Sequence, residues 1–199
     1  MIFSKKGKNN LGESLEKAEL ARLSDIDSTR KVWDNLQKKE IDKYDEFYNV
    51  CLYSSIVYND ISILYDNYHT SNSKTQTNLF GRLLCMTIIE FLDDINPLIG
   101  KSLRLELETN NMREFVEELK EIGKEFAAIK RENNSELRMI RNNSAAHKTK
   151  KAKDLIDFTK ETPFENLNEI VFEISVTNNK LTKLSTRIIS KITETLRNN

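Results

Sequence analysis

Glycine and proline are so rare in this chain that long, uninterrupted helices are the structure it most readily forms. The 199 residues include five Gly and two Pro, and the stretch 29–69 contains neither. Because both residue types punctuate turns and interrupt helices, their scarcity favours long elements. Apolar side chains also recur at helical spacing within 29–69, as at Phe47, Val50, Cys51 and Val57. The sequence therefore predicts an all-α fold.

Charge and cysteine content exclude several classes of function. The 31 basic and 31 acidic residues cancel, so no global field attracts nucleic acid and any anion-binding role needs a local patch. Cys51 and Cys85 lie inside apolar runs and only two His are present, so we expect buried, reduced thiols, no metal site and no cofactor. The N-terminus has no apolar signal segment and no stretch approaches 18 apolar residues, which predicts a soluble, cytoplasmic protein without a membrane anchor.

The N-terminal part is expected to differ from the rest of the chain. A short helix is predicted at 14–22, and the stretch 24–28, rich in residues that cap helix N-termini, is predicted to interrupt it. We therefore expect residues 1–28 to form a flexible extension with a short helix, and residues 29–199 to form one helical bundle domain.

Within that domain, polar breaks are expected to separate the helices. Residues 70–77 have the composition of a loop, and the most apolar helix follows at 78–95, ended by Pro97. An amphipathic helix is predicted at 112–132. Residues 133–135 are predicted to break it and to cap a new helix.

The C-terminal segment carries a heptad-like pattern that predicts one long helix. The residues that form this seam are Ile170, Ile174, Thr177, Leu181, Leu184, Ile188 and, at the last position, Lys191 or Ile192. Such spacing is close to the a/d pattern of helices that pack lengthwise. The seam is expected either to pack along the bundle or to contact a second copy of the chain.

One segment brings together the residues with the most chemical meaning. Arg141, Asn142 and His147 lie within seven residues, on a predicted helix whose Leu137 and Ile140 face the core. Arg141 stands beside that face and His147 follows near the same side, so one ligand can lie over both side chains.

These groups suit metal-free cleavage of RNA. Because a histidine side chain ordinarily has a pKa of about 6.5, His147 is suited to take a proton from a ribose 2′-hydroxyl or to give one to the leaving 5′-oxygen. Arg141 supplies a permanent positive charge and a planar donor fork for the phosphate, and Asn142 can orient either group. The flanking cations expected to hold the RNA backbone are Arg138, Lys148, Lys150 and Lys151.

Arg141-Asn142, followed after four residues by His147, resembles the signature of the HEPN superfamily (higher eukaryotes and prokaryotes nucleotide-binding). The resemblance implies an all-α up-and-down bundle and a metal-independent endoribonuclease of the defence or toxin type. It also implies a homodimer in which two Arg–His pairs form one composite site, with RNA and an antitoxin or other protein as partners. In this scheme Arg141 binds the phosphate, His147 is the catalytic base or acid and Asn142 is the polar residue of the motif. One toxin branch of the family adds a Tyr two residues after the His; Thr149 stands there in this chain.

A structural role for the same residues stays open. His147 at a helix C-terminus would cap it, and Arg141 would pair with a carboxylate. The chain would then be a non-catalytic helical module that binds nucleic acid, or one that recruits a protein partner through the heptad seam.

Five other side chains have simpler expected roles. Glu90, Asp93 and Asp94 are expected at the solvated edge of the 78–95 helix, a salt bridge to Arg138 or Arg141 being the alternative. His69 is expected at the surface, and Trp33 is expected to pack rather than to stack on bases.

Overall fold

The fold is all-α, as the sequence predicts. The computed structural model describes residues 5–144, 153, 164 and 166–198. Within them lie α1 (Lys5–Gln37), α2 (Asp45–Thr70), α3 (Lys74–Leu98), α4 (Lys101–Thr109), the 3-10 helix η1 (Arg113–Phe115), α5 (Val116–Ser144) and α7 (Leu167–Arg197).

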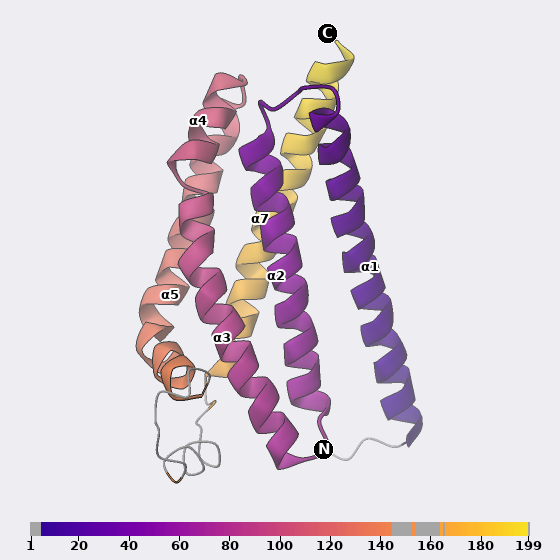
Figure 1. The fold of residues 1–199 in the computed structure, drawn as a ribbon, viewed down its shortest axis with the longest axis vertical. Helices are drawn as coiled ribbons and strands as arrows, with labels where there is room; N and C mark the ends of the chain where they lie inside the picture. The colour runs from indigo at the N-terminus through magenta and orange to yellow at the C-terminus, as the bar shows by residue number, and fades with distance from the viewer. Residues whose placement is uncertain (1–4, 145–152, 154–163, 165, 199) are drawn as a thin grey trace.

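The long helices run alternately up and down (Figure 1). α2 packs on α3, α3 on α5, α5 on α7, and α7 returns to α2, which closes the bundle. α1 lies along α2 on the outside, and the short α4 sits at the end of the bundle where α3 leads into α5. The C-terminal end of α5 and the N-terminal end of α7 therefore meet at the opposite end.

The core is centred on α3, the most apolar helix. Ile88, Phe91 and Leu92 are completely buried, and the ring of Phe91 stacks on Tyr53 and meets Phe126 edge to face. Each such side chain contributes about 1.5–3 kcal/mol when it leaves water. This packing fixes the positions of the neighbouring α2 and α5.

The heptad seam of the C-terminal helix is confirmed and is used within the chain. The first six seam residues are buried in α7, and at the last position Ile192 is buried whereas Lys191 is only partly buried. α7 packs against α5 and α2. The seam is therefore not available to recruit a second copy or another protein, and that part of the interaction hypothesis is wrong.

α1 is continuous, so the predicted interruption at 24–28 is wrong. The helix runs from Lys5 to Gln37 without a break. Asp27 lies inside it and accepts from Arg30 at 3.0 Å and from Lys31 at 2.6 Å. These i,i+3 and i,i+4 ion pairs favour the helix over a capping role for Asp27. The predicted domain boundary after residue 28 falls within this helix.

α5 is also continuous, so the predicted break at 133–135 is wrong. The side-chain amide of Asn133 donates to the carbonyl of Ile129, and Asn134 accepts from Nε of Arg138 at 2.8 Å. Both bonds link residues four apart, so these side chains are satisfied without leaving the helix. The two Asn therefore stand inside one long element.

The structure has a helix break and a short helix that the sequence did not predict. Residues 38–44 separate α1 from α2, and Glu40 adopts the left-handed conformation there, with φ of 57°. A non-glycine residue seldom takes that conformation, so the sequence gives no signal for the turn. The short α4, anchored by the buried Leu103 and Leu107, was not predicted either.

The predicted loop at 70–77 is shorter than expected. Only 71–73 lie outside helices, because Ser73 caps α3 by accepting from the backbone N–H of Gln76. Pro97 lies in the last turn of α3 and marks its end, as predicted.

The remaining expectations for the core are confirmed. Cys51 and Cys85 are buried free thiols, and burial raises the pKa of each to about 12. Trp33 packs against the core beside Tyr48.

Among the helices described, none has the length and apolar character needed to cross a membrane.

Candidate functional site

Three of the predicted site residues are described, and they lie at the end of the bundle where α5 ends and α7 begins. Arg138, Arg141 and Asn142 all lie on the last two turns of α5. Four other predicted site residues lie outside the described residues: His147, Lys148, Lys150 and Lys151.

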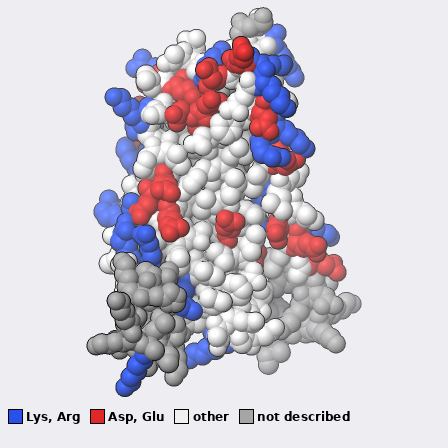
Figure 2. Space-filling model, in the orientation of Figure 1, with Lys and Arg blue, Asp and Glu red and all other residues white. Residues whose placement is uncertain are grey.

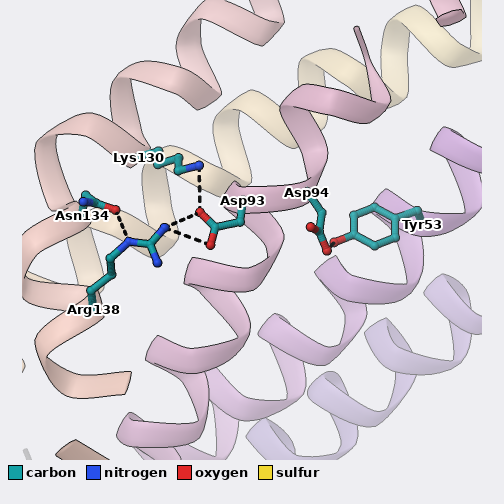
Figure 3. Close-up of polar contacts among 6 residues, drawn as sticks. All are labelled: Tyr53, Asp93, Asp94, Lys130, Asn134 and Arg138. Atoms are coloured by element: carbon teal, nitrogen blue, oxygen red, sulfur yellow. Dashed lines mark hydrogen bonds and ion pairs between the residues drawn. The ribbon is translucent and has the colours of Figure 1, made fainter. Parts of the chain in front are cut away.

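Arg138 is held by a carboxylate of the neighbouring helix (Figure 3). Its Nη2 donates to both oxygens of Asp93 on α3, at 2.9 and 3.1 Å. Lys130, two turns earlier on α5, contacts the same carboxylate at 2.8 Å. Asn134 accepts from Nε of Arg138, so the guanidinium is bound on two sides. This network ties α5 to α3 just before the helix end.

The acidic residues of α3 divide between the two roles expected for them. Asp94 is exposed at the solvated edge and accepts from the hydroxyl of Tyr53 at 3.0 Å. Asp93 is the one that forms the salt bridge to Arg138. Partial burial disfavours its ionised form, but the charges of Lys130 and Arg138 outweigh burial and hold the pKa of Asp93 below its usual range.

Arg141 differs from Arg138 in having no such partner. Leu137 and Ile140 are buried, as predicted, and Arg141 stands beside them, half-buried, in the last turn of α5. Within the described part of the chain, its guanidinium has no hydrogen bond or ion pair. Asn142 is exposed next to it. The two arginines are therefore one turn apart but differ in what they can bind.

The residues just before α7 contact three other helices. The ring of Phe164 lies so close to α3 that a Cβ at Gly81 would come within 2.7 Å of it. The same ring meets Tyr68 of α2 edge to face. Asn166 then donates to Glu136 of α5 at 3.4 Å. These contacts hold the start of α7 beside α2, α3 and α5.

His69 is a residue at this end whose position the sequence did not indicate. It is exposed in the last turn of α2, and its Nε2 lies 2.9 Å from Oδ1 of Asn168 on α7. Tyr65 and Tyr68 hold the ring edge-on. The surface position was predicted, but its place at the same end of the bundle as Arg141 follows only from the order and direction of the helices.

Charges of both signs are interspersed on the visible face of the molecule, around a broad uncharged stripe (Figure 2). No extended basic surface covers this face, in keeping with the zero net charge. Among the described residues, no group of three or more His, Cys, Asp or Glu could hold a metal ion.

No protein-family model, curated protein or solved structure matches this chain.

Proposed function

We propose that this protein is a HEPN-like, metal-independent endoribonuclease of the defence or toxin type that acts as a homodimer. The observation that carries the proposal is the contrast between two arginines on α5. Arg138 is held by Asp93, whereas Arg141, six residues before His147, has no partner among the described residues. A guanidinium without an internal partner is suited to bind a phosphate.

The chemistry follows from the residue types. A base removes the proton from a ribose 2′-hydroxyl, whose oxygen attacks the adjacent phosphorus. The 5′-oxygen leaves with a proton from an acid, and the product is a 2′,3′-cyclic phosphate. His147 serves as one of these two groups, and His147 of the second copy serves as the other. Arg141 stabilises the negative charge on the phosphate oxygens, and Asn142 orients the reacting groups.

The proposal also assigns a role to three lysines, a cellular compartment and a regulator. Lys148, Lys150 and Lys151 would hold the RNA backbone on either side of the cleaved bond. A cytoplasmic location is part of the proposal, because the two free, buried thiols suit a reducing compartment. An antitoxin or other protein that covers the site is the expected regulator.

The test is cleavage of a mixed RNA pool by purified protein in EDTA. Wild type should cleave and leave 2′,3′-cyclic phosphate ends, and His147→Ala should lose about 10²–10⁴-fold in rate. His69→Ala is the matched control, because it removes the only other histidine of the chain and should leave the rate nearly unchanged. A wild type without activity, or a His147→Ala variant as active as wild type, would refute the proposal.

A second candidate function is a non-catalytic protein-interaction module. The observation in its favour is a shallow groove between α5 and α7, where the side chain of Phe172 is 68% exposed and Val176 is 40% exposed. Such apolar side chains suit a protein contact. If wild type cleaves no RNA and Phe172→Glu abolishes self-association in solution, this function is favoured; if Phe172→Glu has no effect on association, it is not.

A further inference from the structure

The shallow groove between α5 and α7 is a surface apart from the proposed RNA site. Its volume is about 260 Å³. Lys180 of α7 contacts Glu125 of α5 at 2.6 Å, and Thr177 donates to the same carboxylate at 3.3 Å, so these two contacts tie the walls together. Arg141 lies further along α5, beyond the residues that line the groove.

The exposed apolar residues of α7 are confined to this groove. Phe172 is 68% exposed and Val176 is 40% exposed, and both line it. All the other exposed residues of α7 are polar or charged. Because Phe172 and Val176 are four residues apart, they lie one above the other on the same face of the helix. They form a short apolar stripe along α7, with Ala128 and Ile129 of α5 beside it.

The charged residues that line the groove are all acidic, namely Glu125, Glu132 and Glu173. The Glu125 carboxylate is already paired with Lys180. Among the described residues, Glu132 pairs only with the adjacent Arg131, at 3.4 Å, and both side chains are largely exposed, so this pair is weak. Glu173 has no ion pair or hydrogen bond within the described part of the chain. Each wall of the groove therefore offers one carboxylate to a partner.

The apolar stripe and the carboxylates beside it determine which occupant fits. RNA would meet like charges, because its phosphates and these carboxylates repel each other. A second copy of the chain packed groove to groove would bring the same carboxylates with it. A segment whose apolar side chains are flanked by Lys or Arg is complementary to the groove in both respects.

The walls also determine the backbone conformation of the occupant. Both are helices, which use their backbone N–H and C=O groups internally, so an extended segment finds no sheet edge to pair with. The affinity must then come from side chains. A helix presents its side chains as a stripe at intervals of three or four residues, which matches the spacing of Phe172 and Val176.

We propose that the groove between α5 and α7 binds a basic amphipathic helix of another protein, whose apolar stripe packs on Phe172 and Val176 and whose Lys or Arg side chains pair with Glu132 and Glu173. The bound helix lies along α5 and α7 and removes the ring of Phe172 from water. The site does not use Arg141, so the proposal holds whether or not the chain cleaves RNA.

The experiment is fluorescence anisotropy on the full chain with labelled, Ala-rich synthetic peptides of about 20 residues, a length at which an isolated helix forms. The first peptide has one stripe of Leu flanked by Lys. The second has Glu in place of each Lys, and the third has the composition of the first with its Leu spread around the helix. The first should bind, the second should not, and the third should bind about tenfold more weakly or worse. If the first peptide does not bind, or if the second binds as tightly, the proposal is wrong.

Two groove variants locate the binding. Phe172→Ser should weaken binding of the first peptide about tenfold or more. Its matched control is Leu105→Ser, at a position on α4 that is 58% exposed and lies outside the groove. Glu132→Lys combined with Glu173→Lys should also weaken binding about tenfold, because two attractions become repulsions. Glu194→Lys, at an exposed position of α7 outside the groove, should bind nearly as wild type does.

The same samples distinguish the basic helix from a second copy of the chain. All the substituted residues are exposed, so the variants should keep the fold. In light scattering, Phe172→Ser should keep the oligomeric state of wild type. A change of that state would show that a second copy fills the groove, which overturns the proposal. Unchanged peptide binding by both groove variants overturns it as well.

Discussion

Glu106 caps a helix to which it does not belong. Its two carboxylate oxygens accept the backbone N–H groups of Glu46 and Phe47, each at 2.9 Å, in the first turn of α2. Tyr44, at the N-cap position of α2, makes no side-chain cap of its own. The α4 carboxylate therefore satisfies two N–H groups that have no partner inside their helix.

The protonation state of the Glu106 carboxyl should affect the free energy of unfolding of the protein. Burial, and then the nearby charges of Glu46 and Asp45, outweigh the two N–H groups and raise the pKa of Glu106 from 4.5 to about 7. Because the folded state holds the proton more tightly, the stabilisation is complete below about pH 4.5 and is lost as pH rises through about 7. In urea titrations, the free energy of unfolding of wild type should decrease across this range.

Glu106→Gln should lack that decrease, because an amide does not titrate but still offers an acceptor oxygen. Glu108→Gln, at an exposed position on the same short helix, should keep the decrease seen in wild type. If Glu106→Gln follows the same pH dependence as wild type, the linkage argued from the α2 cap is wrong.

At the scale of elements, the sequence predicted helices well wherever apolar side chains repeat. The apolar helix at 78–95 and the heptad seam at 170–192 both lie inside helices of the structure, α3 and α7. Helix boundaries were less predictable, because polar residues can bond within a helix as well as cap one. Asp27 pairs with residues three and four further on, and Asn134 bonds to Arg138. Both residues therefore lie inside helices, although the sequence predicted a helix break at each of them.

The two faces of α7 should differ sharply in their contribution to stability. Ile174 is fully buried in the seam, and Ile174→Ala should lower the free energy of unfolding by about 2–5 kcal/mol, through lost burial and the cavity left behind. Phe172, two residues away and 68% exposed, is the control: Phe172→Ala should cost less than about 1 kcal/mol. Equal losses in chemical denaturation would show that the seam does not form the core contact described.

At the scale of the whole molecule, the site depends on which helix ends meet. The sequence identified Arg141 and its motif, but it could not place His69 at the same end, since this follows from the alternating directions of α2 and α5. Nor did the sequence show that Asp93 pairs with Arg138 and not with Arg141, because this pairing depends on how α5 is rotated about its axis relative to α3. Tertiary packing decides such pairings, and local sequence pattern does not.

The composite-site proposal requires a dimer that forms through α5. Met139 is 42% exposed beside the site, and Met139→Glu would place a charge in such an interface. Light scattering at micromolar concentration should give a dimer for wild type and a monomer for Met139→Glu. Leu105→Glu, on α4 at the other end of the bundle and 58% exposed, should remain a dimer. A wild-type monomer would contradict the composite site.

The most direct test of the central claim is the single-turnover rate of RNA cleavage in EDTA for Arg141→Lys, measured beside Arg138→Lys. A lysine keeps the charge but loses the planar fork. Arg141→Lys should lower the rate about 10²–10³-fold with an unchanged melting temperature. Arg138→Lys should keep the rate within about tenfold but melt at a lower temperature, because it loses the two-oxygen contact with Asp93. If Arg141→Lys cleaves at the wild-type rate, or if Arg138→Lys is the variant that loses activity, Arg141 is not the phosphate-binding residue and the account of the site is wrong.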